Sequence, residues 1–131
     1  MNFKTLLMSL CCLTLVLSFI GCTKDAPEKS EPLTLAGKTF EYDYGTAVYR
    51  VNYKSIETLH WKSIKGEEAG KESDETYALQ QLNPYTFFVS WIEADGLGVS
   101  LVLNLKEKKI NAFLKIDAEI IPLSGTVTEI K

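Results

Sequence analysis

Thiols and imidazoles are scarce in this chain of 131 residues. The three cysteines are Cys11, Cys12 and Cys22, so no thiol follows residue 22, and His60 is the only histidine. The part of the chain beyond residue 22 therefore has no disulfide and must be held by its hydrophobic core. A structural zinc site usually takes cysteine and histidine ligands. The sequence predicts neither a metal site nor a cofactor.

Basic charge is also in short supply, with 14 lysine and arginine residues against 17 acidic ones and a formal net charge of −3. No basic stripe is evident, whereas a nucleic-acid-binding protein normally shows one because it must neutralise phosphates. The sequence also lacks a G-x-S-x-G motif, a phosphate-binding loop, a dinucleotide-type glycine pattern and a cysteine–histidine dyad. These absences argue against nucleic-acid binding, nucleotide chemistry and hydrolysis by an activated nucleophile.

One long hydrophobic run is present, from Leu6 to Ile20, with Lys4 before it and Gly21-Cys22 after it. A positively charged start followed by a short apolar segment predicts an export signal rather than a membrane span. Gly21-Cys22 resembles the end of a bacterial lipoprotein signal, in which the new N-terminal cysteine carries the lipid. We therefore expect a lipoprotein signal peptide over residues 1–21 and a lipid on Cys22. The expected location is the bacterial cell envelope, in the outer membrane and facing the periplasm or the cell surface.

The next segment, residues 22–32, is charged, contains proline and has few large apolar side chains. This composition predicts a flexible tether, which would join the rest of the chain to the membrane through Cys22. Residues 33–131 can build one modest core, so we expect a single domain there.

Beyond the tether, apolar and polar residues alternate in short runs separated by turn residues, and no helical stripe of ten residues occurs. Strict alternation is typical of strands with one buried face. Short connections favour successive hairpins, so the sequence predicts an all-β domain, a small antiparallel up-and-down barrel of about eight strands rather than a sandwich. The charged run 65–75 is expected to be a loop. The expected strands are 38–44, 48–53, 58–64, 76–82, 86–93, 98–105, 109–116 and 125–130, with 120–123 as a further short strand or part of a return loop.

The stretch YTFFVSWIE, residues 85–93, is the most informative of these runs because alternation places Glu93 on the same face as four apolar residues, Tyr85, Phe87, Val89 and Trp91. In the first strand, Tyr42 and Tyr44 likewise share one face. A barrel of this size is either filled by side chains or wide enough for one small ligand. Glu93 is accordingly either an acid in a poorly solvated cavity or a solvated acid at the rim, and the residues alone leave both open.

Three segments, GKTFEYDYG, GEEAGK and YTFFVSWIEADGLGVSLVLNL, follow one another along the chain. Their order resembles that of MoaF-like proteins, which are calycin-type (lipocalin-like) barrels named from the molybdenum cofactor biosynthesis protein F domain. A more distant resemblance is to phenolic acid decarboxylases. The most specific element is Ser90-Trp91-x-Glu93, followed by a glycine turn. The resemblance implies a ligand site in the barrel mouth, made by Tyr42, Tyr44, Lys71, Trp91 and Glu93.

In the decarboxylases, a pair of tyrosines binds the substrate carboxylate and a glutamate transfers a proton, together with an arginine that follows a glycine. Tyr42 and Tyr44 match the pair, Glu93 matches the glutamate, and Lys71 stands where the arginine would be. Lysine cannot present the planar fork of arginine. The resemblance therefore implies a pocket more than it implies the reaction.

We expect a lipid-anchored barrel that binds a small aromatic or carboxylate-bearing molecule. Two alternatives remain at this point: an acid–base enzyme of the decarboxylase-like lyase type with Glu93 as its catalytic group, and an envelope interaction module without a ligand. Of these, the balance is against an enzyme, and the sequence does not define an oligomeric state.

Overall fold

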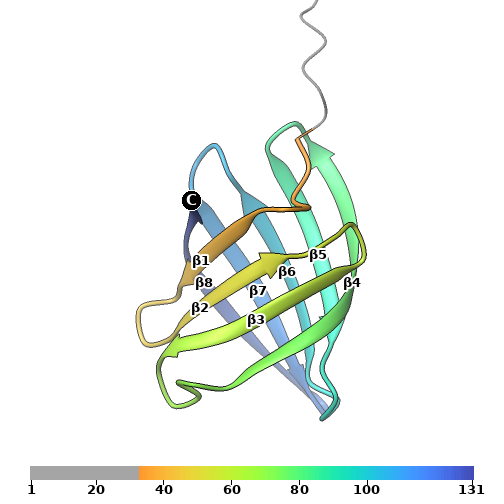
Figure 1. Ribbon diagram of the computed structural model, residues 1–131. Coiled ribbons are helices and arrows are strands. Elements are labelled where there is room, and N and C mark those ends of the chain that lie inside the picture. The colour runs from red at the N-terminus through yellow and green to blue at the C-terminus, as the bar shows by residue number, and fades with distance from the viewer. Residues whose placement is uncertain (1–32) are drawn as a thin grey trace, which may run out of the picture.

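Eight antiparallel strands form a closed barrel in the computed structural model, which describes residues 33–131 (Figure 1). The expected signal peptide, the tether and Cys22 lie outside the described residues. Each strand pairs with the next, and β8 pairs with β1, so the predicted all-β up-and-down barrel is confirmed. The strands are β1 (Thr39–Asp43), β2 (Val48–Tyr53), β3 (Thr58–Lys65), β4 (Glu72–Asn83), β5 (Thr86–Ile92), β6 (Gly98–Asn104), β7 (Lys109–Ile116) and β8 (Glu119–Ile130).

Among residues 33–131, no helix has the length and hydropathy needed to cross a membrane.

Burial alternates along β3, β5 and β6 as the sequence pattern predicts, whereas β4 and β8 each have one buried residue. In β5, Phe87, Val89 and Trp91 are buried, whereas Phe88 and Ile92 lie on the outer wall. Tyr85 departs from the expected pattern, because it lies in the turn before β5 and is exposed. The inward residues of all eight strands meet in one core, and their burial is the main favourable contribution to folding.

Two strand boundaries differ from the prediction by more than one residue, the starts of β4 and β8. β4 begins at Glu72, so the end of the charged run 65–75 is strand and not loop. Its first residues pair with β3, Glu72 with Lys62 and Ser73 with Trp61, and polar side chains on both faces conceal the alternation. β8 is a single strand from Glu119 to Ile130, so residues 120–123 belong to it and form no return loop.

The two ends of the barrel are different. At one end, which we call the closed end, the segment 33–38 folds over the opening, and the Leu35 side chain enters the core and is 1% exposed. The Gly37 N–H donates to the Tyr53 carbonyl at 2.7 Å, and the Tyr53 N–H donates to the Lys38 carbonyl at 2.9 Å, which holds this segment against β2. The interior beneath it is filled by fully buried side chains such as Phe40 and Leu59.

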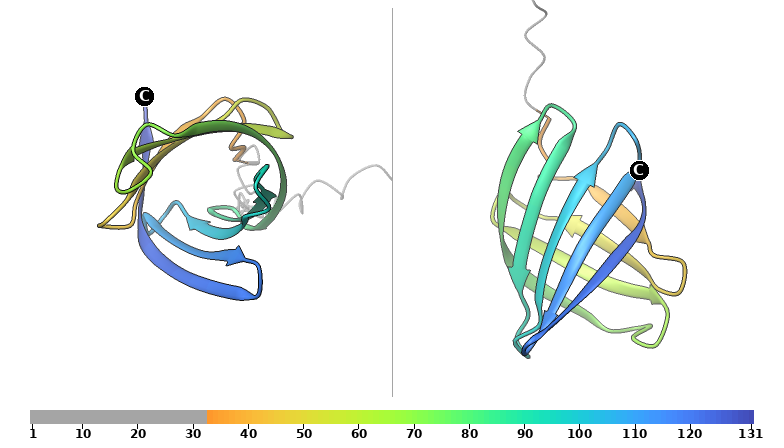
Figure 2. Two further views of the ribbon diagram at one scale, coloured as in Figure 1. Left: turned by 90° about the horizontal axis from the view of Figure 1, so that it is seen from below. Right: turned by 180° about the vertical axis from the view of Figure 1, so that it is seen from behind.

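The other end, which we call the mouth, carries the loops that follow the odd-numbered strands. In an up-and-down barrel these loops must lie together, and the views along and behind the barrel show them at the end opposite to where the described chain begins (Figure 2). The mouth loops are residues 44–47, 66–71, 93–97 and 117–118. The loops at the closed end are 54–57, 84–85 and 105–108.

Candidate functional site

A cavity extends from the mouth into the barrel and ends at the packed half of the interior. It leaves about 60 Å³ that the centre of a water molecule can reach. At roughly 15 Å³ for each water, this is room for about four waters or for one small organic group. The residues that line it are Tyr42, Tyr44, Tyr49, Val51, Trp61, Glu68, Trp91, Glu93, Leu97, Val99, Leu114 and Leu123.

Aromatic rings from β2, β3 and the loop between β1 and β2 form one wall of the cavity. The ring centres of Tyr44 and Tyr49 lie 6.3 Å apart with planes at 68°, and those of Tyr49 and Trp61 lie 6.2 Å apart with planes at 71°. These edge-to-face contacts are favourable and fix the rings at an angle to one another. Trp91 from β5 and Tyr42 from β1 add two further rings. The arrangement is an angled set of rings around a small space.

A pair of buried tyrosines lies at the inner end of the cavity, toward the closed end of the barrel. The hydroxyls of Tyr42 and Tyr53 are 2.7 Å apart, and the Tyr53 ring packs edge-on against Tyr77 with ring centres 5.1 Å apart. Burial raises the pKa of both Tyr42 and Tyr53 well above the usual value. Burial also raises the pKa of Tyr44. These phenols are therefore neutral hydrogen-bonding groups at any ordinary pH.

Glu93 stands at the mouth, one residue beyond the end of β5. Its backbone N–H donates to the Leu97 carbonyl at 2.9 Å, which forms the turn that places its side chain at the cavity. The Trp91 indole N–H donates to Glu93 Oε1 at 3.3 Å. Burial, with smaller contributions from Asp95, Glu75 and Glu68, raises the pKa of Glu93 to about 7, although the Trp91 hydrogen bond acts in the opposite direction.

A second carboxylate, Glu68, reaches the cavity from the loop between β3 and β4. The Tyr49 hydroxyl donates to Glu68 Oε2 at 3.0 Å, and Lys71 Nζ lies 3.1 Å from Glu68 Oε1. Burial, the hydrogen bond to Glu68 and its charge together raise the pKa of Tyr49 to about 12. Lys71 itself does not line the cavity, and its side chain is 67% exposed.

Two polar atoms near this site have no protein partner. The indole nitrogen of Trp61 is buried without a hydrogen bond, and so is Oε1 of Glu75 on β4. Glu75 pairs in register with the buried Leu59, and its neighbour along the inner face, Tyr77, pairs with Trp91. Buried polar atoms without partners are rare in folded proteins and call for an explanation.

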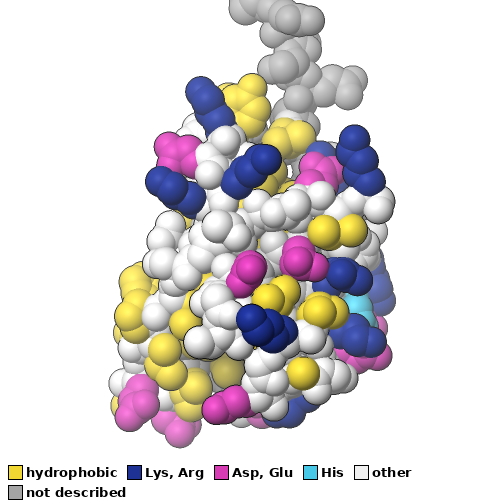
Figure 3. All heavy atoms as spheres, turned by 90° about the vertical axis from the view of Figure 1, so that its left-hand side faces the viewer, with side chains coloured by type: hydrophobic (Ala, Val, Ile, Leu, Met, Phe, Trp, Pro, Cys, Tyr) yellow, Lys and Arg dark blue, Asp and Glu magenta, His cyan; other side chains and the backbone are white. Residues whose placement is uncertain are grey.

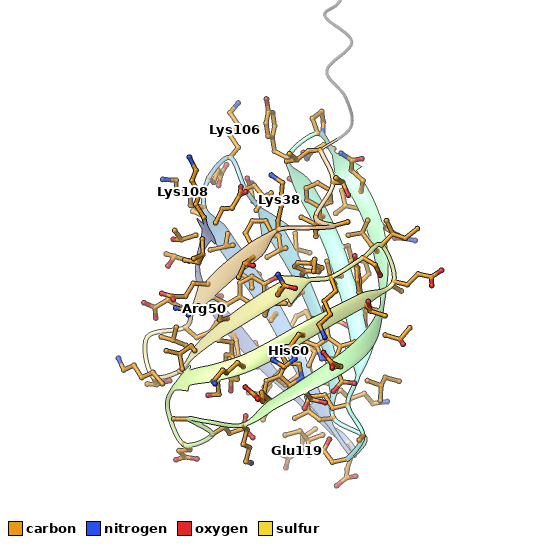
Figure 4. All side chains as sticks on the ribbon, in the orientation of Figure 1. Lys38, Arg50, His60, Lys106, Lys108 and Glu119 are labelled. Carbon is orange, nitrogen blue, oxygen red and sulfur yellow. The ribbon has the colours of Figure 1, made fainter. Side chains whose placement is uncertain are left out.

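Charge is distributed unevenly along the barrel. The mouth loops carry Glu67, Glu68, Glu93, Asp95 and Asp117 but only one base, Lys71. At the closed end, Lys38, Lys106 and Lys108 lie together, and Glu119 lies at the opposite end (Figure 4). The space-filling view agrees, with several basic side chains near the end where the described chain begins and acidic ones along the lower edge (Figure 3). His60 and Arg50 lie on the outer wall (Figure 4).

The structure brings together four of the five residues expected at the site, namely Tyr42, Tyr44, Trp91 and Glu93. Lys71 is not among them, because its loop directs it to solvent and to Glu68. Tyr49 and Trp61 also line the cavity, and alternation along residues 48–53 and 58–64 could have added them. Glu68 lies in a loop, so no periodic signal could have found it.

Within residues 33–131, no three histidine, aspartate or glutamate side chains are grouped as a metal ion would require.

Three comparisons bear on this chain. A family model described as MoaF-like matches residues 36–128. A crystal structure of a proposed β-lactamase from Burkholderia vietnamiensis is similar, with a TM-score of 0.71 and 21% sequence identity, over 77% of this chain and 100% of that chain. That likeness shows the fold alone. No curated protein sequence matches the chain.

Proposed function

The chain belongs to the MoaF-like family, and on this basis we propose that it binds a small molecule with an aromatic or other apolar part in the mouth of its barrel. One observation carries the proposal: a cavity with five aromatic side chains and two carboxylates opens at one end of a barrel whose other half is fully packed. Concave apolar sites with a few converging polar groups are the usual form of small-ligand sites.

Of the ligand types that the sequence suggested, a carboxylate-bearing one has less support. Among the described residues, no lysine, arginine or histidine lines the cavity. The neutral phenols could donate hydrogen bonds to a carboxylate, but its charge would face Glu68 and Glu93 without a cationic partner. Apolar contact with the rings is therefore the main source of affinity in this proposal.

Ligand-induced stabilisation tests the proposal, because a ligand that binds only the folded state raises the melting temperature by mass action. We expect members of a library of small aromatic compounds to raise it in the wild type. The Leu97→Trp variant, which fills the mouth from a lining position, should lose this response. Ile92→Trp is the matched control, since Ile92 is 70% exposed on the outer wall and should leave the response intact. Equal responses in Leu97→Trp and the wild type would contradict binding in this cavity.

The cellular setting is a second part of the proposal. We propose that the protein is exported and anchored in the bacterial envelope by a lipid on Cys22, as the Leu6–Ile20 run and Gly21-Cys22 suggest. Cys22→Ser should move the protein from the membrane fraction to the soluble fraction. Cys12→Ser, a change within the signal segment, should not. A soluble wild type, or a Cys22→Ser protein that stays in the membrane fraction, would contradict lipid anchoring.

A second candidate function is acid–base catalysis. It is favoured by one observation, that the pKa of Glu93 is raised to about 7 by burial, which suits a group that gives and takes protons near neutral pH. Loss of chromophore on incubation with hydroxycinnamic acids, abolished in Glu93→Gln, would support it. No loss, or equal loss in the variant, would count against it. The exposed position of Lys71 weakens the comparison with decarboxylases.

A further inference from the structure

Negative groups outnumber positive ones at the mouth of the cavity. Glu68 and Glu93 both line it, and Glu75 on β4 contributes to the electrostatic environment of Glu93. Two bases lie at the mouth outside the lining: Lys71 Nζ is 3.1 Å from Glu68 Oε1, and Lys65 donates to the Gly45 carbonyl. The interior thus presents carboxylate oxygens to any molecule that enters, without a competing cation in the described lining.

The aromatic wall suits the same kind of ligand. A cation within about 6 Å of a ring centre is attracted by the negative face of the ring, more strongly where the site is shielded from solvent. Several rings set at an angle can contact one cationic group from different sides. Tyr44, Tyr49 and Trp61 have this relation, with successive planes at 68° and 71°. Trp91 lies beside Glu93, to which its indole N–H donates.

Two unpartnered atoms add an independent observation. Glu75 Oε1 is buried and accepts no hydrogen bond in the protein. Trp61 lines the cavity, is 8% exposed, and its indole N–H has no acceptor. The Trp61 indole N–H is thus an unmet donor in a residue that lines the cavity, and such groups call for an explanation. Glu75 is not among the lining residues and acts on the site through its negative charge near Glu93.

We propose that the cavity takes a small organic cation, a protonated or quaternary amine attached to an apolar group, held between Glu68, Glu93 and the aromatic rings. This rests on the proposed function and names the ligand class for the same cavity. The acidic mouth loops favour the approach of such a cation, because a cleft lined by charge of one sign concentrates ions of the other.

The ionisation of Glu93 makes the affinity for a cation depend on pH in a direction that can be measured. The groups that face Glu93 are the Trp91 indole on β5, Asp95 in its own turn, Glu75 on β4, Glu68 in the loop before β4 and the Tyr49 phenol on β2. A cation among them stabilises the ionised carboxylate and lowers the pKa of Glu93 from about 7. Affinity for a cation therefore rises as the pH rises through 7. Affinity for a carboxylate falls over the same range.

Three probes with one benzene ring separate the possibilities: benzyltrimethylammonium, benzyl alcohol and benzoate. In titration calorimetry at pH 8, we expect the cation to bind about tenfold more tightly than the alcohol and benzoate to bind most weakly. Between pH 6 and pH 8, the cation affinity should rise by up to about tenfold, the limit set by full ionisation of one carboxyl. The alcohol affinity should change little.

Charge-neutralising variants assign the effect to residues. Glu93→Gln should weaken cation binding about tenfold and remove its pH dependence, and it should weaken binding of the alcohol far less. Glu68→Gln should weaken cation binding without removing the pH dependence. Glu129→Gln is the matched control, since Glu129 pairs with Lys38 at the closed end. Melting curves of each variant show whether it is folded.

Different results would count against the cation class and against small-molecule binding in the cavity. Tighter binding of benzyl alcohol or benzoate than of the cation would overturn the cation class while supporting small-molecule binding in the cavity. Cation binding that is unchanged in both Glu93→Gln and Glu68→Gln would also overturn it. Failure of all three probes to bind would count against the proposed function itself.

Discussion

The hydroxyls of Tyr42 and Tyr53 lie 2.7 Å apart beneath the cavity, and both side chains are almost completely buried. Each hydroxyl is therefore the hydrogen-bond partner of the other in the protein. Tyr42 also lines the cavity, so this pair joins the site to the packed half of the barrel. The bond makes the floor of the cavity a rigid part of the core.

The losses of stability caused by removing the two hydroxyls should not be additive. Tyr42→Phe and Tyr53→Phe should each lower the free energy of unfolding by about 1–3 kcal/mol, because each leaves a buried hydroxyl unpaired. The double variant should lose clearly less than the sum. Urea denaturation of the four proteins measures the coupling, and strictly additive losses would show that the two hydroxyls do not act as a pair.

Glu93 should make stability depend on pH. Its pKa rises from 4.5 in the unfolded chain to about 7 in the folded barrel, so the folded state holds the proton more strongly. The folded barrel should lose stability as the pH rises from 4.5 to 7, by on the order of 1 kcal/mol given the partial solvation of the group. Glu93→Gln should show a flatter profile between pH 5 and pH 8. Identical slopes in the variant and the wild type would contradict this, and Glu129→Gln again serves as the control.

Gly125 should be required for the closure of the barrel between β1 and β8. A Cβ atom at this position would collide with the carbonyl oxygen of Asp43 on β1. Gly125→Ala should lower the free energy of unfolding by about 1–3 kcal/mol, the usual cost of overpacking. Gly98→Ala is the control, since its Cβ would meet only the Lys115 Cβ at 3.5 Å. Thermal melting compares them, and equal melting temperatures would show that β1 moves aside without cost.

Leu35 should contribute more stability than its place before the first strand suggests. Leu35→Ala removes a side chain that is 1% exposed and should cost about 2–5 kcal/mol. Ile56→Ala, at a position 74% exposed on the neighbouring loop, should change stability by less than about 0.5 kcal/mol. Chemical denaturation of the two variants tests whether the segment 33–38 is part of the folded unit, and a small loss in Leu35→Ala would place it outside.

Alternation in the sequence predicted the strands well where one face is apolar and the other polar. It placed Phe87, Val89 and Trp91 inside, as the structure confirms. It failed at the start of β4, where Glu72 and Ser73 are polar on both faces and the strand is held by backbone pairing to β3. Physically, a strand near an open end needs no apolar inner face, so the sequence signal fades there although the hydrogen bonds continue.

The residues of the site that lie on or next to strands could be predicted from the sequence, whereas those in longer loops could not. Tyr42, Tyr44 and Trp91 followed from alternation and from the family resemblance, and they line one cavity with Glu93. The position of Lys71 was not predictable, because the direction of a loop side chain depends on turn geometry and on its partner Glu68. The same limit hid Glu68, and the sequence could not show that half of the interior is filled and half is open.

Because Leu35 fills the closed end of the barrel, the cavity opens only at the mouth. A ligand must leave by the route through which it entered, past the same mouth loops. The barrel is therefore not a channel from one end to the other. The described chain begins at the sealed end (Figure 1). A tether at that end would attach the barrel by the end opposite the mouth, so the attachment itself would leave the entrance of the cavity uncovered.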